Sequence, residues 1–183
     1  MKSFDQILKE SYSALDSESI LIPRRSPEER KRNFLIATNK KIREYIRNGS
    51  IWDLDLQGTP ITSLPEGLTV GGNLYLAGTP ITSLPEGLIV GGGLYLGGTP
   101  ITSLPEGLTV NGSLSLYGTS ITSLPKGLTV GGDLYLYGTS ITSLPEGLTV
   151  GGSLWLEGTP LSKKYSEEEL KRMLPGVKGD IYI

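Results

Sequence analysis

Leucine, isoleucine and valine recur along most of this chain in a pattern that repeats every 20 residues. The segment from Leu74 to Gly93 reads LYLAGTPITSLPEGLIVGGG, and close copies begin at residues 54, 94, 114 and 134. A further copy begins at Leu154 and diverges after Leu161. A period of this length predicts a repeat architecture, in which each copy forms one structural unit that stacks on the next.

Within one copy, alternating apolar and polar positions predict a closed coil of short extended segments and turns. Leu74 and Leu76 lie on one face of a strand, and residue 75 lies on the other. Gly78 is expected to bend the chain, and the segment Leu84–Gly87 fits a type I turn with proline second and glycine fourth. One coil alone buries too little apolar surface to offset its conformational entropy, so only a stack can fold. Six positions point inward in each coil: Leu74, Leu76, Ile81, Leu84, Leu88 and Val90.

The segment before the repeats predicts a helix that caps the first coil. Ser26-Pro27-Glu28-Glu29 is a capping box with proline at the first helical position, and Asn48-Gly49 is a helix stop. We expect one apolar face to lie over the first coil, with Ile51 and Trp52 filling the junction. That face consists of Leu35, Ile42, Tyr45 and Ile46.

The segment after the repeats predicts a second cap and one more strand. Ser166-Glu167-Glu168-Glu169 is another capping box, which opens a short helix to about Leu174. The last residues, Val177–Ile183, resemble Val130–Leu136 and return to the repeat pattern. They predict a seventh strand after a longer, 27-residue coil. A frayed terminus in solvent is the alternative for this segment.

The run Leu-x-Leu-x-x-Thr-x-Ile-x-x-Leu-Pro resembles the leucine-rich-repeat family, in particular its short 20-residue bacterial class, over about residues 54–161. The resemblance implies a β-solenoid of parallel stacked short strands: six coils and a seventh strand, capped by an N-terminal helix and a short C-terminal helix. The expected organisation is a leader and linker at 1–25, a capping helix at 26–49, the solenoid at 50–160, and the C-terminal cap helix and final strand at 161–183.

Two columns depart from the family pattern. Threonine stands where the family has asparagine, and we expect its hydroxyls to bond to the backbone of adjacent coils. The family's leading apolar position is occupied by Gly71, Gly91, Asn111, Gly131 and Gly151. Losing that side chain thins the coil on one side and leaves open a flatter β-solenoid rather than a horseshoe. The threonine column is Thr59, Thr79, Thr99, Thr119, Thr139 and Thr159.

Outward strand positions form two vertical columns rich in aromatic residues. Adjacent strands lie about 4.8 Å apart, so we expect the rings to stack into a continuous ridge. Tyrosine and tryptophan are enriched at interaction hot spots, although aromatic ladders also stabilise sheets. Both interpretations stay open, and the candidate binding residues are Tyr75, Tyr95, Tyr117, Tyr135, Tyr137, Trp155 and Tyr182.

Composition and charge exclude several classes of function. The chain has no cysteine and no histidine, which removes the commonest zinc ligands and the usual nucleophile–base pairs. We therefore expect no cofactor, no metal and no enzymatic activity; Asp53 and Asp55 are a weak candidate carboxylate pair. The net charge of −2 indicates no nucleic-acid partner, and no apolar stretch predicts a membrane span.

Residues 54–153 hold one lysine against six acids. The turn column Glu66, Glu86, Glu106, Lys126 and Glu146 is expected to be a solvated edge.

The first ten residues, MKSFDQILKE, resemble the capsid-targeting leader of internal head proteins of T-even-like phages. Leu8-Lys9-Glu10 matches the cut site of the prohead protease, which implies cleavage after Glu10. The alternative is an ordinary N-terminal docking helix. If the chain is phage-encoded, the resemblance implies a location in the host cytoplasm or the virion interior; otherwise we expect it in the cytoplasm.

The sequence therefore favours a non-enzymatic protein-binding repeat module, with a phage-encoded protein that binds a host or phage protein as its specific form. A structural or virion component, including a solenoid that self-assembles through its terminal strand edge, is the second hypothesis. A carbohydrate-binding surface is the third, since stacked aromatic rings suit sugar rings. The sequence names neither the partner nor the oligomeric state.

Overall fold

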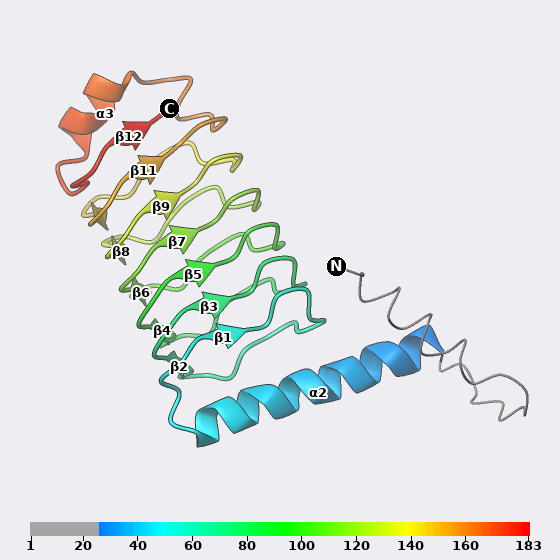
Figure 1. The fold of residues 1–183 in the computed structure, drawn as a ribbon. Helices are drawn as coiled ribbons and strands as arrows, with labels where there is room; N and C mark the ends of the chain where they lie inside the picture. The colour runs from blue at the N-terminus through cyan, green and yellow to red at the C-terminus, as the bar shows by residue number, and fades with distance from the viewer. Residues whose placement is uncertain (1–25) are drawn as a thin grey trace, which may run out of the picture. The chain divides into compact units, whose positions relative to one another are not determined.

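The computed structural model describes residues 26–183, and residues 31–183 form one compact unit (Figure 1). Seven short parallel strands, one from each successive coil, form its first sheet. Each of the first five strands pairs with the strand 20 residues later, and the sixth pairs through Leu154 with Ile181. The predicted seventh strand is confirmed. In order, the strands are β1 Leu54–Asp55, β3 Leu74–Tyr75, β5 Leu94–Tyr95, β7 Leu114–Ser115, β9 Leu134–Tyr135, β11 Leu154–Trp155 and β12 Ile181–Tyr182.

A second parallel sheet of five strands runs along another side of the coils. Each of its strands ends on the buried valine of the repeat. A bridge between Val150 and Val177 continues the pairing into the final segment. The strands are β2 Thr69–Val70, β4 Ile89–Val90, β6 Thr109–Val110, β8 Thr129–Val130 and β10 Thr149–Val150. The fold is thus a parallel β-solenoid with two sheets.

The core is a continuous apolar column inside the coils. The six predicted positions are buried in the second copy, with exposed fractions between 0 and 7% from Leu74 to Val90. The same positions are buried in the other copies, apart from the partly buried Leu144. Because each of the five full copies contributes the same six side chains at the same height, the core is continued from coil to coil.

The turn after each Leu-Pro pair differs from the predicted type I turn. The amide of Leu108 donates to the carbonyl of Pro105 at 3.4 Å, so the turn begins at proline, one residue later than predicted. Gly107 is then third and has φ +71°, which is the feature of a type II turn. Glycine occupies this position because other residues resist a positive φ.

The threonine column also differs from its prediction. The hydroxyl of Thr79 donates to the carbonyl of Leu76 at 2.7 Å, within its own coil, rather than to an adjacent coil. The Thr79 amide donates to the same carbonyl at 3.1 Å. Since the short threonine side chain reaches back only three residues, it closes a local turn instead of linking coils. The same bond recurs at Thr59, Thr99, Thr119, Thr139 and Thr159.

Glycine at the leading column allows neighbouring coils to touch through their backbones. A Cβ added at Gly131 would lie 2.0 Å from the carbonyl oxygen of Asn111. The amide of Gly131 instead donates to Val110 at 2.9 Å. The four glycines of this column therefore contribute close backbone pairing where the leucine-rich-repeat family contributes a side chain.

Helix α2, Pro27–Arg47, has both of its predicted ends. The Ser26 hydroxyl accepts the Glu29 amide at 3.1 Å, and the Glu29 carboxylate accepts the Ser26 amide at 2.8 Å, which confirms the capping box. At the other end Gly49 has φ +88°. The amides of Gly49 and Ser50 then donate to Ile46 and Tyr45, which is the Schellman pattern.

The junction between α2 and the first coil is not filled by Ile51 and Trp52 as predicted, because these side chains are 64% and 72% exposed. Tyr45 takes that place. Its hydroxyl lies 2.8 Å from the carbonyl of Ser50 and 2.6 Å from that of Trp52, and it accepts the Gly71 amide at 3.3 Å. The backbone polar groups of the junction need a polar partner, and two apolar side chains cannot supply one. Of the predicted apolar face, Ile42 is buried and Leu35 and Ile46 are exposed.

Helix α3, Glu167–Met173, caps the other end. The predicted capping box between Ser166 and Glu169 is present. Leu170 is buried against the core, and α3 contacts β12. Bonds from Ser166 hold the pKa of the Glu169 carboxyl below its ordinary value.

Candidate binding surface

The two outward columns of the seven-stranded sheet lie where the alternation placed them. Tyr75 pairs with Tyr95 and Trp155 with Tyr182, so one residue of each strand faces away from the core. The second column stands two residues later in each coil and carries Tyr117, Tyr137 and Glu157. All seven predicted binding residues are partly or fully exposed, and the sheet brings them onto one face.

The aromatic rings stack, but in two groups rather than one continuous ridge. Tyr75 and Tyr95 form one pair, with ring centroids 4.8 Å apart and planes 8° from parallel. Ser115 follows Tyr95 in the column and interrupts the stack, since its side chain has no ring. The prediction of a continuous ridge is therefore wrong, and we name the first group the Tyr75–Tyr95 pair.

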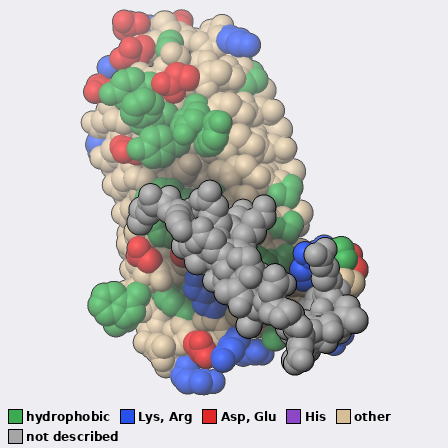
Figure 2. Space-filling view, turned by 45° about the vertical axis from the view of Figure 1, so that its right-hand side comes forward, with side chains coloured by type: hydrophobic (Ala, Val, Ile, Leu, Met, Phe, Trp, Pro, Cys, Tyr) green, Lys and Arg blue, Asp and Glu red, His purple; other side chains and the backbone are tan. Residues whose placement is uncertain are grey.

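The second group, which we name the C-terminal aromatic cluster, spans both columns. Trp155 stacks between Tyr135 at 5.8 Å and Tyr182 at 4.0 Å. In the next column Tyr117 stacks on Tyr137 at 4.5 Å, and Tyr137 meets Tyr135 edge to face at 6.3 Å. Figure 2 shows hydrophobic side chains gathered in one patch over the upper, C-terminal coils. The cluster consists of Tyr117, Tyr135, Tyr137, Trp155 and Tyr182.

Neighbouring positions in the sequence set the tilt of these rings. The Tyr135 hydroxyl donates to the Asp133 carboxylate at 3.0 Å, so its ring leans over the preceding turn. Tyr95 leans the same way over Gly93, where an added Cβ would lie 2.7 Å from its Oη. Burial raises the pKa of Tyr95, and burial together with Asp133 raises that of Tyr135, so both phenols stay neutral at physiological pH.

Two polar atoms on this face have no partner within residues 26–183. The indole Nε1 of Trp155 and the carboxylate Oε2 of Glu157 are buried and make no hydrogen bond with this part of the chain. The backbone places Glu157 beside Tyr137, because the Gly138 amide donates to the Glu157 carbonyl at 3.0 Å. Buried polar groups are ordinarily paired with protein or ordered water, so each of these atoms requires a partner that the described residues do not supply. Glu157 was not among the predicted site residues; its acidic side chain in an otherwise uncharged column was the available signal.

A polar ladder beside the sheet was also not predicted. The residue before a strand uses its side-chain oxygen to accept the amide of its counterpart in the next coil, except before β5, where Gly93 has no side chain. Asp53 accepts from Asn73 at 2.7 Å, and Asp133 accepts from Ser153 at 2.7 Å. Asp53 is therefore engaged in coil stacking, and Asp55 accepts the Gln57 amide at 3.0 Å. The weak carboxylate-pair hypothesis has no support in this geometry.

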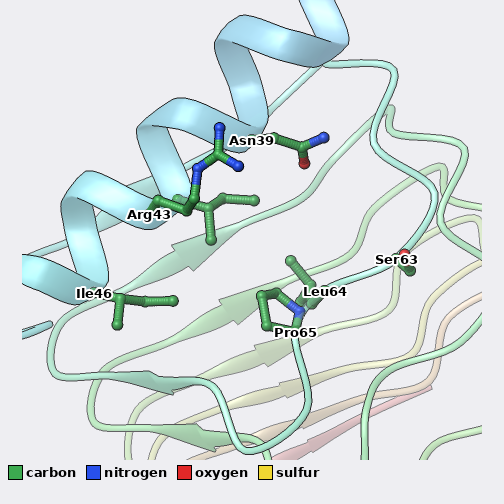
Figure 3. A pocket seen from close by; sticks show the side chains of 7 residues that line it. Asn39, Arg43, Ile46, Ser63, Leu64 and Pro65 are labelled. Carbon is green, nitrogen blue, oxygen red and sulfur yellow. The ribbon is translucent and has the colours of Figure 1, made fainter.

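A small groove lies where α2 crosses the first coil (Figure 3). Its volume is about 330 Å³. Arg43 and Asn39 extend from the helix on one side, and Leu64 and Pro65 lie on the turn opposite. The Lys41 ammonium also bonds to the Asp55 carbonyl and ties α2 to β1. The groove is remote in the fold from the C-terminal aromatic cluster, which belongs to the last coils.

The other predicted features fall outside the cluster. The turn column Glu66, Glu86, Glu106, Lys126 and Glu146 is exposed. Glu10, the predicted cleavage position, lies outside the described residues. Between residues 26 and 183, no group of acidic side chains gathers as a metal site, and no helix has the length and apolarity to cross a bilayer.

Comparison with known proteins gives little beyond the fold. No protein-family model matches the chain, and no curated protein matches it. Among solved structures, it matches the leucine-rich-repeat domain of a Shigella effector at 15% identity and a TM-score of 0.37. The match covers 99% of this chain and 98% of that chain. At this TM-score, the assignment of the fold as a β-solenoid rests on the strands and registers above.

Proposed function

We propose that this chain is a non-enzymatic protein-binding module that uses the C-terminal aromatic cluster as its contact surface. The observation that carries the proposal is the grouping of four tyrosines and a tryptophan on one face of a rigid sheet, with Tyr117 50% exposed and Tyr182 39% exposed. Aromatic side chains bury large areas at low entropic cost and dominate interface energetics. A stacked β-solenoid holds them in place before a partner arrives, which lowers the ordering cost of association.

Paired alanine variants test this proposal against a purely structural ladder. Tyr135→Ala with Trp155→Ala removes the centre of the cluster, and Tyr75→Ala with Tyr95→Ala removes a stacked pair from the same column. Partners captured from a lysate and identified by mass spectrometry should be lost with the first variant and retained with the second. Circular dichroism establishes that both variants fold. If the folded Tyr135→Ala, Trp155→Ala variant retained every partner, the aromatic cluster would serve only to stabilise the sheet.

The specific form of the proposal is a phage-encoded protein that binds a host or phage protein, located in the host cytoplasm or the virion interior. The support is the resemblance of residues 1–10 to a capsid-targeting leader. Mass spectrometry of purified virions tests the packaged form, which predicts a chain that begins after Glu10. Particles that lack the protein, or that contain it with residues 1–10 uncut, would remove the packaging hypothesis.

Self-assembly into a virion or structural component is the second candidate. The observation in its favour is β12, which has a sheet neighbour on one side only. However, α3 contacts β12 and α2 is tied to β1, so a helix accompanies each end of the sheet. Natural edges covered in this way resist end-to-end pairing. Light scattering distinguishes the hypotheses, since self-assembly requires species larger than a monomer.

A further inference from the structure

We infer that the C-terminal aromatic cluster, together with Glu157, recognises an arginine side chain of a partner protein. This inference rests on the proposed function and names the chemistry of its contact. Three features of the face converge on a planar cation: stacked rings with an exposed surface, an acidic oxygen without a donor, and the absence of basic side chains from the two columns around them.

Glu157 supplies the anionic acceptor. It lies beside Tyr137 in the second outward column, fixed there by the bond from the Gly138 amide to its carbonyl. Its Oε2 is buried and receives no hydrogen bond, and within residues 26–183 its carboxylate forms no ion pair. An unpaired carboxylate oxygen carries a desolvation cost, and a donor from a ligand relieves that cost.

Tyr117 and Tyr137 supply the π surface. Their rings stack at 4.5 Å and are 50% and 36% exposed, and the next residue in their column is Glu157. A cation over a tyrosine face is attracted by the ring quadrupole. A guanidinium stacks on a ring and donates to a carboxylate in the same plane, whereas an ammonium does so less well.

The surrounding charges favour a cation and leave Glu157 as the acid that is available to it. Asp133 already accepts the Tyr135 hydroxyl at 3.0 Å, and Asp180 lies 3.8 Å from the Lys171 ammonium. Between residues 115 and 157 the two outward columns contain no lysine or arginine. The approach of a negatively charged ligand is therefore disfavoured, and that of a positively charged one is favoured.

Trp155 indicates that the cation is part of a peptide. Its Nε1 donor is buried without an acceptor among residues 26–183, two residues before Glu157 in the same coil. A peptide carries main-chain carbonyl acceptors next to its arginine side chain, so it matches both orphan atoms. A simple cation matches only the carboxylate, and a neutral sugar lacks the positive charge that the column of Glu157 favours.

The chain contains a matched control for this inference. The Tyr75–Tyr95 pair has the same strand register and the same stacking, yet its neighbours in the second column are Gln57, Ala77 and Gly97. It therefore offers stacked rings without the second tyrosine column, and the acid beside it, Asp55, already accepts the Gln57 amide at 3.0 Å. A ligand that needs only stacked rings would bind at both the Tyr75–Tyr95 pair and the C-terminal aromatic cluster. A ligand that needs the rings together with Glu157 would bind only at the cluster.

Fluorescence of Trp155 gives a direct test. The chain has two tryptophans, so Trp52→Phe leaves Trp155 as the reporter. Tri-arginine amide, tri-lysine amide and tri-citrulline amide are titrated into the full chain, and calorimetry gives the affinities. We expect tri-arginine to bind most tightly and the neutral citrulline peptide to bind at least about tenfold more weakly, as loss of a charged hydrogen bond predicts.

Single and double substitutions test which residues bind tri-arginine. Glu157→Gln should weaken tri-arginine binding by about tenfold, and Tyr137→Ala should weaken it as well, with circular dichroism unchanged. Tyr75→Ala with Tyr95→Ala should leave it intact. Equal binding of the citrulline and arginine peptides, or an unaltered affinity in Glu157→Gln, would overturn the inference.

The failure of this inference is distinguishable from failure of the proposed function. If Tyr135 and Trp155 are needed to capture a protein while tri-arginine gives no response, the protein-binding module stands and the arginine contact falls. If the cluster instead binds a neutral oligosaccharide such as cellohexaose, and no peptide or protein, both fall and the carbohydrate hypothesis replaces them.

Discussion

At the scale of single residues, side chains that act on the backbone define each coil. Threonine closes a turn by bonding to the carbonyl three residues earlier, as Thr119 does with Leu116 at 2.8 Å. Glycine does the opposite, since its lack of a side chain lets one coil rest on the next. Both effects recur once per coil, so a change in one copy should have a cost that is local and measurable.

Removing one buried threonine hydroxyl should reduce stability modestly. Thr119 is 4% exposed, and Thr119→Val keeps its shape while deleting the bond to Leu116. The expected loss is about 1 kcal/mol in the free energy of unfolding, measured by denaturant titration. Thr122→Val is the matched control, because Thr122 is exposed, and it should change stability little. Equal losses in the two variants would contradict a specific role for the buried hydroxyl.

Alanine at a leading glycine should be far more damaging than alanine at an outward one. In Gly131→Ala the new Cβ would lie 2.0 Å from a backbone oxygen of the neighbouring coil, and backbone cannot move aside cheaply. The expected loss is about 1–3 kcal/mol or more. In Gly97→Ala the nearest atom is 3.7 Å away, an ordinary contact, so the thermal midpoint should hardly shift. Similar midpoints for both variants would show that the coils are not in close backbone contact at this column.

At the scale of elements, the two helices are attached in different ways. Helix α3 is a short continuation of the last coil, with Leu170 in the core and a closed capping box. Helix α2 is longer and largely exposed, and it is held through Ile42, Lys41 and the hydroxyl of Tyr45. The attachment of α2 therefore depends on few contacts, which makes single substitutions informative.

Deleting the Tyr45 hydroxyl should cost more than truncating the much larger Trp52. Tyr45→Phe leaves the carbonyls of Ser50 and Trp52 and the Gly71 amide without this partner. We expect a loss of about 1–2 kcal/mol, visible as faster amide exchange in residues 45–71. Trp52→Ala should be nearly neutral, because that side chain is 72% exposed. A larger loss of stability in Trp52→Ala than in Tyr45→Phe would instead support the predicted apolar junction.

The α3 capping box should make stability sensitive to acid. The folded pKa of Glu169 lies below its ordinary value of 4.5, so its contribution is present above pH 4.5 and is lost as the pH falls through the folded pKa. The native chain should therefore exceed Glu169→Gln in thermal stability near neutral pH. That difference should shrink in titrations below pH 4.5. A difference that is constant across this range would mean that the charge of Glu169 contributes nothing to the cap.

At the scale of the whole molecule, repetition explains what the sequence could predict. The period, the inward positions and the seventh strand follow from a local pattern that recurs in every copy, and both capping boxes follow from short local motifs. The acceptor of the threonine hydroxyl, the first residue of the turn and the exposure of Trp52 were not predicted. Each depends on which of several nearby backbone groups forms a hydrogen bond, and the spacing of residues in the sequence does not decide this. Glu157 became a candidate only when the structure showed its oxygen without a donor.

Deleting one complete coil should leave a folded protein. Removal of residues 94–113 joins Gly93 to Leu114, which occupies the register of Leu94. The shortened chain should keep its circular dichroism spectrum and the C-terminal aromatic cluster, with reduced stability because one set of nearest-neighbour contacts is gone. Removal of residues 94–103 alone deletes β5 without restoring the register, so this control should not unfold cooperatively. A folded control would argue that the register between coils is loosely specified.

The direction of the inter-coil hydrogen bonds has a mechanical consequence. Bonds such as that from the Leu94 amide to Ser113 run along the stacking direction, so tension along that direction pulls them apart one rung at a time instead of shearing many together. Each detached coil would release 20 residues, about 70 Å of extended chain. Under load the molecule should therefore lengthen in small, regular steps at low force, because one coil detaches at a time.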